Sequence, residues 1–99
     1  FEMETSVVEL IKEGDKVCGV IAVDKDGQQI KAMAKSVIVA TGGFGNNKEM
    51  LAKEFNLHLC EDFYPFMVPG IVGDGLNMMW KAGAMKYGAG RQFINFRIT

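Results

Sequence analysis

The sequence is poor in the residues that build metal and disulfide sites. It has 2 cysteines and 1 histidine, with neither a CxxC nor a CxxxH spacing. Structural zinc sites and redox-active dithiols need such closely spaced ligands. We therefore expect no metal site, and we expect Cys18 and Cys60 to be reduced, buried side chains that behave as small hydrophobic groups.

Long runs of one kind of residue are also missing. The 11 basic and 12 acidic residues give a net charge of −1 without a basic block, which argues against a nucleic-acid partner. No apolar run reaches the roughly 18 residues that a membrane-spanning helix needs, so we expect no span in this segment. The cellular location stays open between the cytoplasm and the bacterial periplasm or cell envelope.

Neither end of the chain looks like a polar tail. The sequence starts at Phe1 instead of Met and stops at Thr99, inside an apolar-rich run. We interpret the chain as an internal segment of a longer protein. We expect residues 1–99 to form part of one domain, with strands over 1–34 and a strand, a turn, two helices and a loop over 35–99.

Residues 1–34 have the pattern of strands joined by tight turns. Polar, turn-forming residues occupy 13–16 and 24–27. A largely apolar run at 7–11 precedes the first turn, and a short third strand is expected around 28–33 after the second. Between the turns, every second residue points to one face of a half-buried strand: Val17, Gly19, Ile21 and Val23. The pattern predicts a three-stranded antiparallel meander.

The next segment is different in kind. Residues 36–40 are continuously apolar and β-branched after Ser36, which is typical of a strand buried on both faces of a parallel sheet. After the turn at 41–45, Asn46 or Asn47 is placed to cap a helix over 48–55. Its expected buried stripe comprises Met50, Leu51 and Phe55.

A second glycine-rich element precedes the last predicted helix. Gly73-Asp74-Gly75 opens the apolar run 76–84, which predicts a buried helix containing Met78, Met79, Trp80 and Ala82. The free N–H groups at the start of a helix attract anions such as phosphate. Asp74 has two candidate roles, as the cap of this helix or as an acceptor for a ligand hydroxyl or ring nitrogen, and one carboxylate can serve both.

The glycine pair in Ala40-Thr41-Gly42-Gly43 is a candidate ligand site. Glycines at the end of a strand let a backbone approach a ligand closely, and ligands bind beyond the carboxyl ends of strands in open α/β sheets. A simple tight turn explains the same four residues. The fold class expected from all these elements is an α+β or α/β segment with a meander, one parallel strand and two helices.

Taken in order, three stretches of the sequence resemble one protein family. They are VVELIKEGDKVCGVIAVDKDG, AKSVIVATGGFGNNKEML and GDGLNMMWKAGA. This order is similar to that of the Rossmann-like FAD-binding domain in the fumarate reductase/succinate dehydrogenase flavoprotein family. That family includes flavocytochrome-type fumarate reductases, urocanate reductase-like proteins and 3-ketosteroid dehydrogenases. The resemblance covers residues 5–87.

The resemblance implies where FAD contacts the chain. The meander would lie beside adenine, with a backbone contact at Val7 or Val8. The turn formed by Ala40, Thr41, Gly42 and Gly43 would lie against the adenosine and pyrophosphate, and Asp74 would belong to the inner wall of the site. The implied activity is hydride transfer between the flavin and a CH–CH or C=C substrate, either a fumarate-like enoate or a ketosteroid.

The segment also departs from the family pattern. The GxGxxG phosphate turn and the ribose-binding acid are absent, and residues 92–96 (QFINF) replace the family's Gln-x-His-Pro-Thr stretch. The family's catalytic Arg and His residues lie outside this segment. We therefore assign no catalytic residue here, and we expect the isolated segment to be inactive, to retain no FAD and to self-associate.

Two other functions remain open from the sequence alone. The segment is a candidate for a non-catalytic scaffold or interaction module, or for a piece of a pyridine nucleotide-disulfide oxidoreductase. The feature that separates them is the placement of the two glycine motifs. Convergence of the 40–43 and 73–75 motifs on one groove favours the FAD site.

Overall fold

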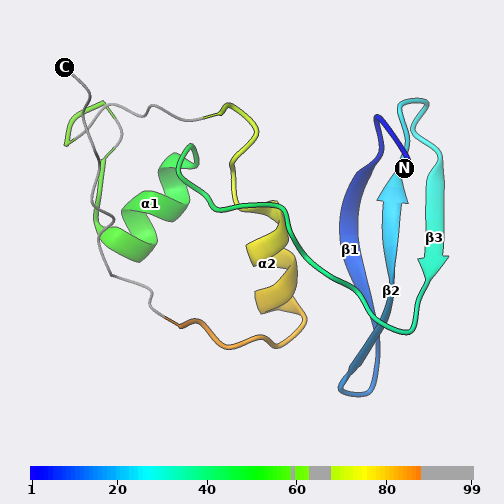
Figure 1. Cartoon of the computed structure of the whole chain (residues 1–99). Coiled ribbons are helices and arrows are strands. Elements are labelled where there is room, and N and C mark those ends of the chain that lie inside the picture. The colour runs from blue at the N-terminus through cyan, green and yellow to red at the C-terminus, as the bar shows by residue number, and fades with distance from the viewer. Residues whose placement is uncertain (59, 63–67, 88–99) are drawn as a thin grey trace. The chain divides into compact units, whose positions relative to one another are not determined.

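The computed structural model describes residues 1–58, 60–62 and 68–87. Its elements, in chain order, are the strands β1 (Ser6–Glu13), β2 (Lys16–Val23) and β3 (Gln29–Met33) and the helices α1 (Lys48–Phe55) and α2 (Asp74–Lys81) (Figure 1). They divide between two compact units. The first unit contains the three strands and α2, and the second contains α1 and the loops around it.

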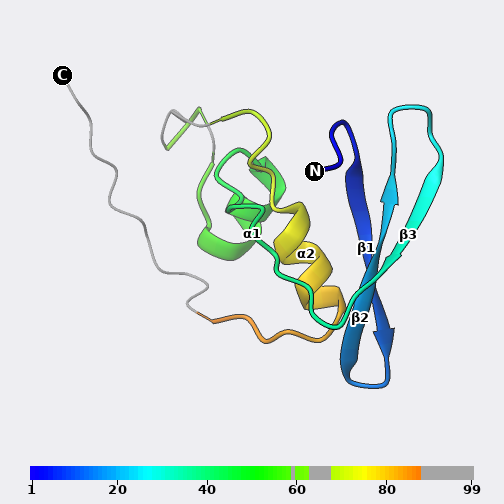
Figure 2. The same ribbon diagram turned by 45° about the vertical axis from the view of Figure 1, so that its right-hand side comes forward.

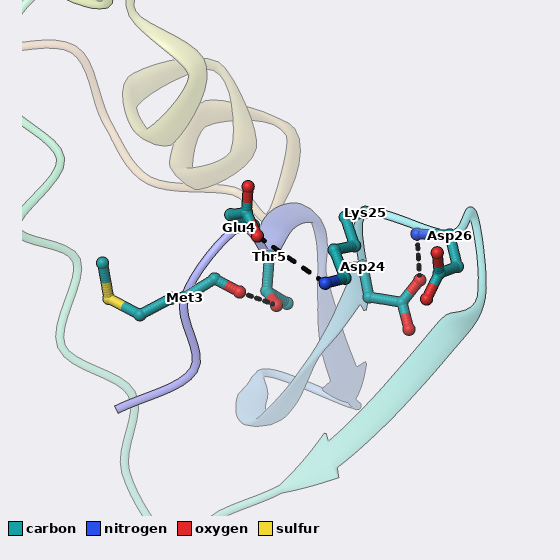
Figure 3. A network of polar contacts seen from close by, with 6 residues as sticks. All are labelled: Met3, Glu4, Thr5, Asp24, Lys25 and Asp26. Atoms are coloured by element: carbon teal, nitrogen blue, oxygen red, sulfur yellow. Dashed lines mark hydrogen bonds and ion pairs between the residues drawn. The ribbon is translucent and has the colours of Figure 1, made fainter.

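The three strands form the antiparallel meander that the sequence predicts. The sheet order is β1-β2-β3, with β2 in the centre and an edge strand on each side (Figure 2). The turn between β2 and β3 is fixed by local polar contacts, since one carboxylate oxygen of Asp24 accepts from the backbone N–H groups of Asp26 at 2.9 Å and Gln28 at 2.8 Å. Figure 3 shows this turn beside the exposed Lys25–Glu4 ion pair, whose charged atoms are 4.0 Å apart.

Two bulges interrupt the pairing of β1 with β2. Val7 pairs with Ala22 and Glu9 pairs with Ile21, so that Val8 has no partner between them. A second irregularity lies on β2, where Cys18 is the extra residue. A bulge bends its strand and re-aims the neighbouring side chains, so the start of β1 departs from a regular two-residue alternation.

The predicted parallel strand over 36–40 is not confirmed. This segment is extended but joins no sheet of the described residues. Val37 and Val39 are half-buried, whereas the side chain of Ile38 is 90% exposed. A β-strand is defined by backbone hydrogen bonds to a neighbouring strand, and no described strand pairs with this segment.

In the second unit, α1 has the bounds and the cap that the sequence predicts. The side chain of Asn47 accepts from the backbone N–H of Met50 at 3.0 Å, and its amide donates to the carbonyl of Val72 at 2.7 Å. Met50 and Leu51 are buried, as predicted. Phe55 is only half-buried, and its ring stacks on that of Phe44 with 5.5 Å between ring centroids.

The cysteine prediction is correct in oxidation state and wrong in burial. Both cysteines are free, but only Cys18 is partly buried and Cys60 is exposed. Cys60 lies in a turn and has a left-handed φ of 67°. In the same turn, a hydrogen bond from the backbone N–H of His58, at 2.6 Å, lowers the pKa of Asp62.

Within 1–58, 60–62 and 68–87, no helix has the length and apolar character needed to cross a membrane. The sequence features at 92–96 lie outside the described residues.

Candidate functional site

The first unit contains an open cleft of about 400 Å³. One wall is the start of β1 and the other is α2, and these two elements lie side by side (Figure 1). The residues that line the cleft are Ser6, Val7 and Val8 on β1 and Asp74, Asn77, Met78 and Lys81 on α2.

The β1 wall owes its form to the bulge at Val8. In a regular strand, consecutive side chains point to opposite faces, so Val7 and Val8 would not border the same space. The extra residue relaxes this alternation, and both valines line the cleft with exposed fractions of 40% and 51%. Because β1 is an edge strand, the N–H and C=O groups on its outer side have no strand to pair with in this sheet.

The α2 wall is a polar face of the helix. The residues Asp74, Asn77, Met78 and Lys81 follow the spacing i, i+3, i+4 and i+7, which places them on one side of the helix. A helix that packs closely on a sheet carries an apolar stripe there, yet three of these four side chains are polar. The helix therefore leaves a cleft where an apolar face would close against β1.

Asp74 is the first residue of α2 and not the residue before it. Its side chain is exposed and lines the cleft. Among residues 1–58, 60–62 and 68–87, none forms a hydrogen bond with its carboxylate. The capping role that the sequence suggested is thus not observed among the described residues.

The two glycine motifs meet inside the first unit. A Cβ added to Gly75 would overlap the hydroxyl oxygen of Thr41 and would lie 2.8 Å from a methyl carbon of Val39. Only glycine therefore allows the extended segment 39–41 to lie against the first turn of α2. This contact brings the Thr41 motif next to Asp74, although more than 30 residues separate them in the sequence.

The predicted site residues fall into three groups. Val7, Val8 and Asp74 line one cleft, and Thr41 packs against the residue that follows Asp74. Ala40 and Gly42 are exposed neighbours of Thr41 outside the cleft lining, and Gly43 begins the second unit.

Sequence reasoning missed four cleft residues, namely Ser6, Asn77, Met78 and Lys81. The sequence predicted that α2 is a buried helix. In the structure the buried residue of α2 is Gly75, and four residues expected in the core are only half-buried, namely Met78, Met79, Trp80 and Ala82. The polar i, i+3, i+7 positions 74, 77 and 81 were the signal for this open face.

The family model that describes the FAD binding domain matches residues 1–99. The chain belongs to the FAD-binding domain family. Two relatives support this membership, each 35% identical to the chain. One is an NADH:acrylate oxidoreductase of Vibrio harveyi, over 88% of the chain, and the other an NADH:fumarate oxidoreductase of Klebsiella pneumoniae, over 83%. The chain spans 9% of the length of each relative.

Solved structures share the fold of this FAD-binding segment. A flavocytochrome c3 fumarate reductase in its open conformation matches with a TM-score of 0.73 and 33% identity, over 82% of the chain and 14% of that protein. A 3-ketosteroid-Δ4-(5α)-dehydrogenase from Rhodococcus jostii matches with a TM-score of 0.70, over 82% of the chain and 17% of that protein. The second pair is 22% identical, so this match shows the fold alone.

The contact at Gly75 generates the first prediction. We expect Gly75→Ala to push the 39–41 segment away from α2 and to lower the free energy of unfolding of the full-length protein by about 1–3 kcal/mol. Thermal unfolding followed by circular dichroism measures this loss. Gly70→Ala is the matched control, because a Cβ at Gly70 meets no atom within 4 Å in the described chain. Equal stability of the two variants would contradict the packing role of Gly75.

Proposed function

We propose that this chain forms part of the FAD site of an oxidoreductase that transfers hydride between flavin and a CH–CH or C=C substrate. One observation carries the proposal. Val7, Val8 and Asp74, which the family resemblance assigned to the cofactor, line one cleft although they come from opposite parts of the chain. The runner-up functions, a scaffold and a disulfide oxidoreductase piece, require no such convergence.

The cleft has the groups that a nucleotide needs. An adenine ring presents an apolar face together with hydrogen-bond donors and acceptors at its edge. The exposed valine side chains provide apolar contact, and the outer edge of β1 provides backbone N–H and C=O groups. The carboxylate of Asp74 provides an acceptor for a ligand hydroxyl or ring N–H. We therefore assign Val7, Val8 and Asp74 to FAD.

Ala40, Thr41, Gly42 and Gly43 form the second part of the proposed FAD contact. Gly42 has a φ of +77°, in the left-handed region that glycine adopts more readily than residues with a Cβ. Gly43 lacks a positive φ, and no atom of the described chain lies within 4 Å of the place of a Cβ. No contact among the described residues requires glycine at position 43, whereas close approach of a ligand to its backbone does.

The proposed reaction rests on the chemistry of the relatives' substrates. The relatives are named for acrylate and fumarate, and both acids contain an activated C=C bond. Bound FAD supplies the hydride chemistry, while the protein holds and orients it. This chain contributes binding residues and no catalytic residue, and we propose that residues 1–99 are part of a single FAD-binding domain. A fumarate-like enoate or a ketosteroid is the proposed substrate.

Flavin content tests the proposal directly. We expect the purified full-length protein to show flavin absorbance bands and to release FAD that mass spectrometry identifies. Asp74→Asn removes the charge of the proposed acceptor, and a hydrogen bond to a charged group contributes about 1.5–3 kcal/mol. We thus expect the FAD dissociation constant to rise about tenfold or more. Asp26→Asn, in the exposed turn of Figure 3, is the control. A colourless protein that also refuses added FAD would overturn the proposal.

The exposed glycine at 43 gives an independent prediction. We expect Gly43→Ala to leave thermal stability unchanged and to weaken FAD binding about tenfold or more, since overpacking one methyl group costs about 1–3 kcal/mol. Isothermal titration of the apoprotein with FAD measures the affinity. The variant Gly70→Ala, equally open in the described chain, should bind like wild type. Unchanged affinity in Gly43→Ala would place Gly43 outside the cofactor site.

We further propose that the 99-residue chain self-associates when it is produced alone. Its first unit exposes several large apolar side chains and two sheet edges, which are the surfaces through which incomplete domains associate. Sedimentation velocity over a range of concentrations should show species heavier than one chain, and Ile38→Lys, at a 90% exposed site, should reduce them. A single species with the mass of one chain at high concentration would contradict this proposal.

A further inference from the structure

Two lysine contacts join the end of α2 to β1. The ammonium group of Lys12, on β1, donates to the carbonyl of Ala82 at 2.7 Å, just beyond the last residue of the helix. In the opposite direction, the ammonium group of Lys81, on α2, lies 3.6 Å from a carboxylate oxygen of Glu9, on β1. A lysine of β1 therefore contacts the end of α2, and a lysine of α2 contacts β1.

The Lys12 contact suits the end of a helix. The last carbonyl groups of a helix lack intrahelical partners and carry partial negative charge. A lysine from a neighbouring element that donates to such a carbonyl satisfies one of these groups and is attracted by the helix dipole. Lys12 therefore fixes the end of α2 at a defined place on β1.

These contacts lie at one end of the cleft. Glu9 and Lys12 follow the cleft residues 6–8 on β1, and Lys81 and Ala82 terminate α2. The other end of the helix is fixed by the packing of Gly75 on Thr41. Between these two attachments, the α2 face that lines the cleft carries the polar side chains of Asp74 and Asn77 beside Met78. The separation of the cleft walls therefore depends on how the ends of the helix are held.

We infer that Glu9, Lys12 and Lys81 are positioning residues that set the separation of the β1 and α2 walls and thereby the affinity of the cleft for FAD. The inference rests on the proposed FAD site. Glu9 and Lys12 lie outside the cleft lining, and Lys81, which lines the cleft, is assigned its positioning role through the ion pair with Glu9. Lys81 is 76% and Glu9 49% exposed, so each contact alone has a modest effect.

Charge reversal separates positioning from direct ligand binding. The experiment measures the FAD dissociation constant of the full-length apoprotein by flavin fluorescence for Glu9→Lys, for Lys81→Glu and for the double variant. We expect each single reversal to raise the constant about two- to fivefold, as expected for an exposed ion pair. We expect the double variant to return to within about twofold of wild type, because the pair is restored with its charges exchanged.

Lys12 is tested with a conservative rescue. Lys12→Met should weaken FAD binding about two- to fivefold, and Lys12→Arg, which keeps a charged donor, should bind like wild type. The control is Lys25→Met, whose ammonium group forms an exposed ion pair with Glu4 in the turn of Figure 3. This variant should leave FAD affinity unchanged. Thermal unfolding of every apoprotein shows whether the variants fold.

The outcomes distinguish the inference from the proposed function. Restored affinity in the double reversal and in Lys12→Arg supports the positioning role. Weakened single reversals without rescue would make Lys81 a direct ligand of FAD and overturn the inference while the FAD site stands. Wild-type affinity in all variants would overturn it as well. A wild-type protein that binds no FAD would remove the proposed function and the inference together.

Discussion

The contact between Gly75 and Thr41 is the constraint on which the first unit depends. Because Gly75 has no side chain, the extended segment that ends in the Thr41 motif lies directly against the first turn of α2. That contact orients the start of the helix, and Lys12 holds its other end on β1. The positions of Asp74 and of the polar helix face follow from these two attachments. The absence of a side chain at Gly75 therefore affects the geometry of the cleft, although Gly75 does not line it.

The cleft itself results from two departures from regular packing. A regular β1 would turn Val7 and Val8 to opposite faces, and an apolar α2 face would close on the sheet. The bulge at Val8 and the polar residues at 74, 77 and 81 prevent both outcomes. Bulges are frequent beside functional sites because they re-aim side chains. The coincidence of both departures at one place supports a ligand site more strongly than either does alone.

Local sequence signals predicted the elements whose causes are local. The turns around Asp24 and the Asn47 cap of α1 depend on neighbouring residues, and both were predicted from the sequence. The bulge at Val8 depends on its register against β2, and the open face of α2 depends on what the helix meets. The bulge is therefore not encoded in a short window, whereas the polar spacing at 74, 77 and 81 marks the open face of α2 in the sequence. The parallel strand predicted over 36–40 is not confirmed, and it too depends on distant residues, since β-branched residues indicate a preference for pairing but not the presence of a partner.

Recognition through backbone explains why glycines and strand geometry dominate the proposed site. Every residue except proline carries both a backbone N–H and a C=O, so what distinguishes a binding segment is access to these groups. The β1 edge and Gly43 provide such access in the described chain. A cofactor that carries its own reactive atoms needs only to be bound and oriented. In the proposed site, this segment therefore acts by binding: its backbone and the carboxylate of Asp74 hold the cofactor, and no catalytic residue is assigned to it.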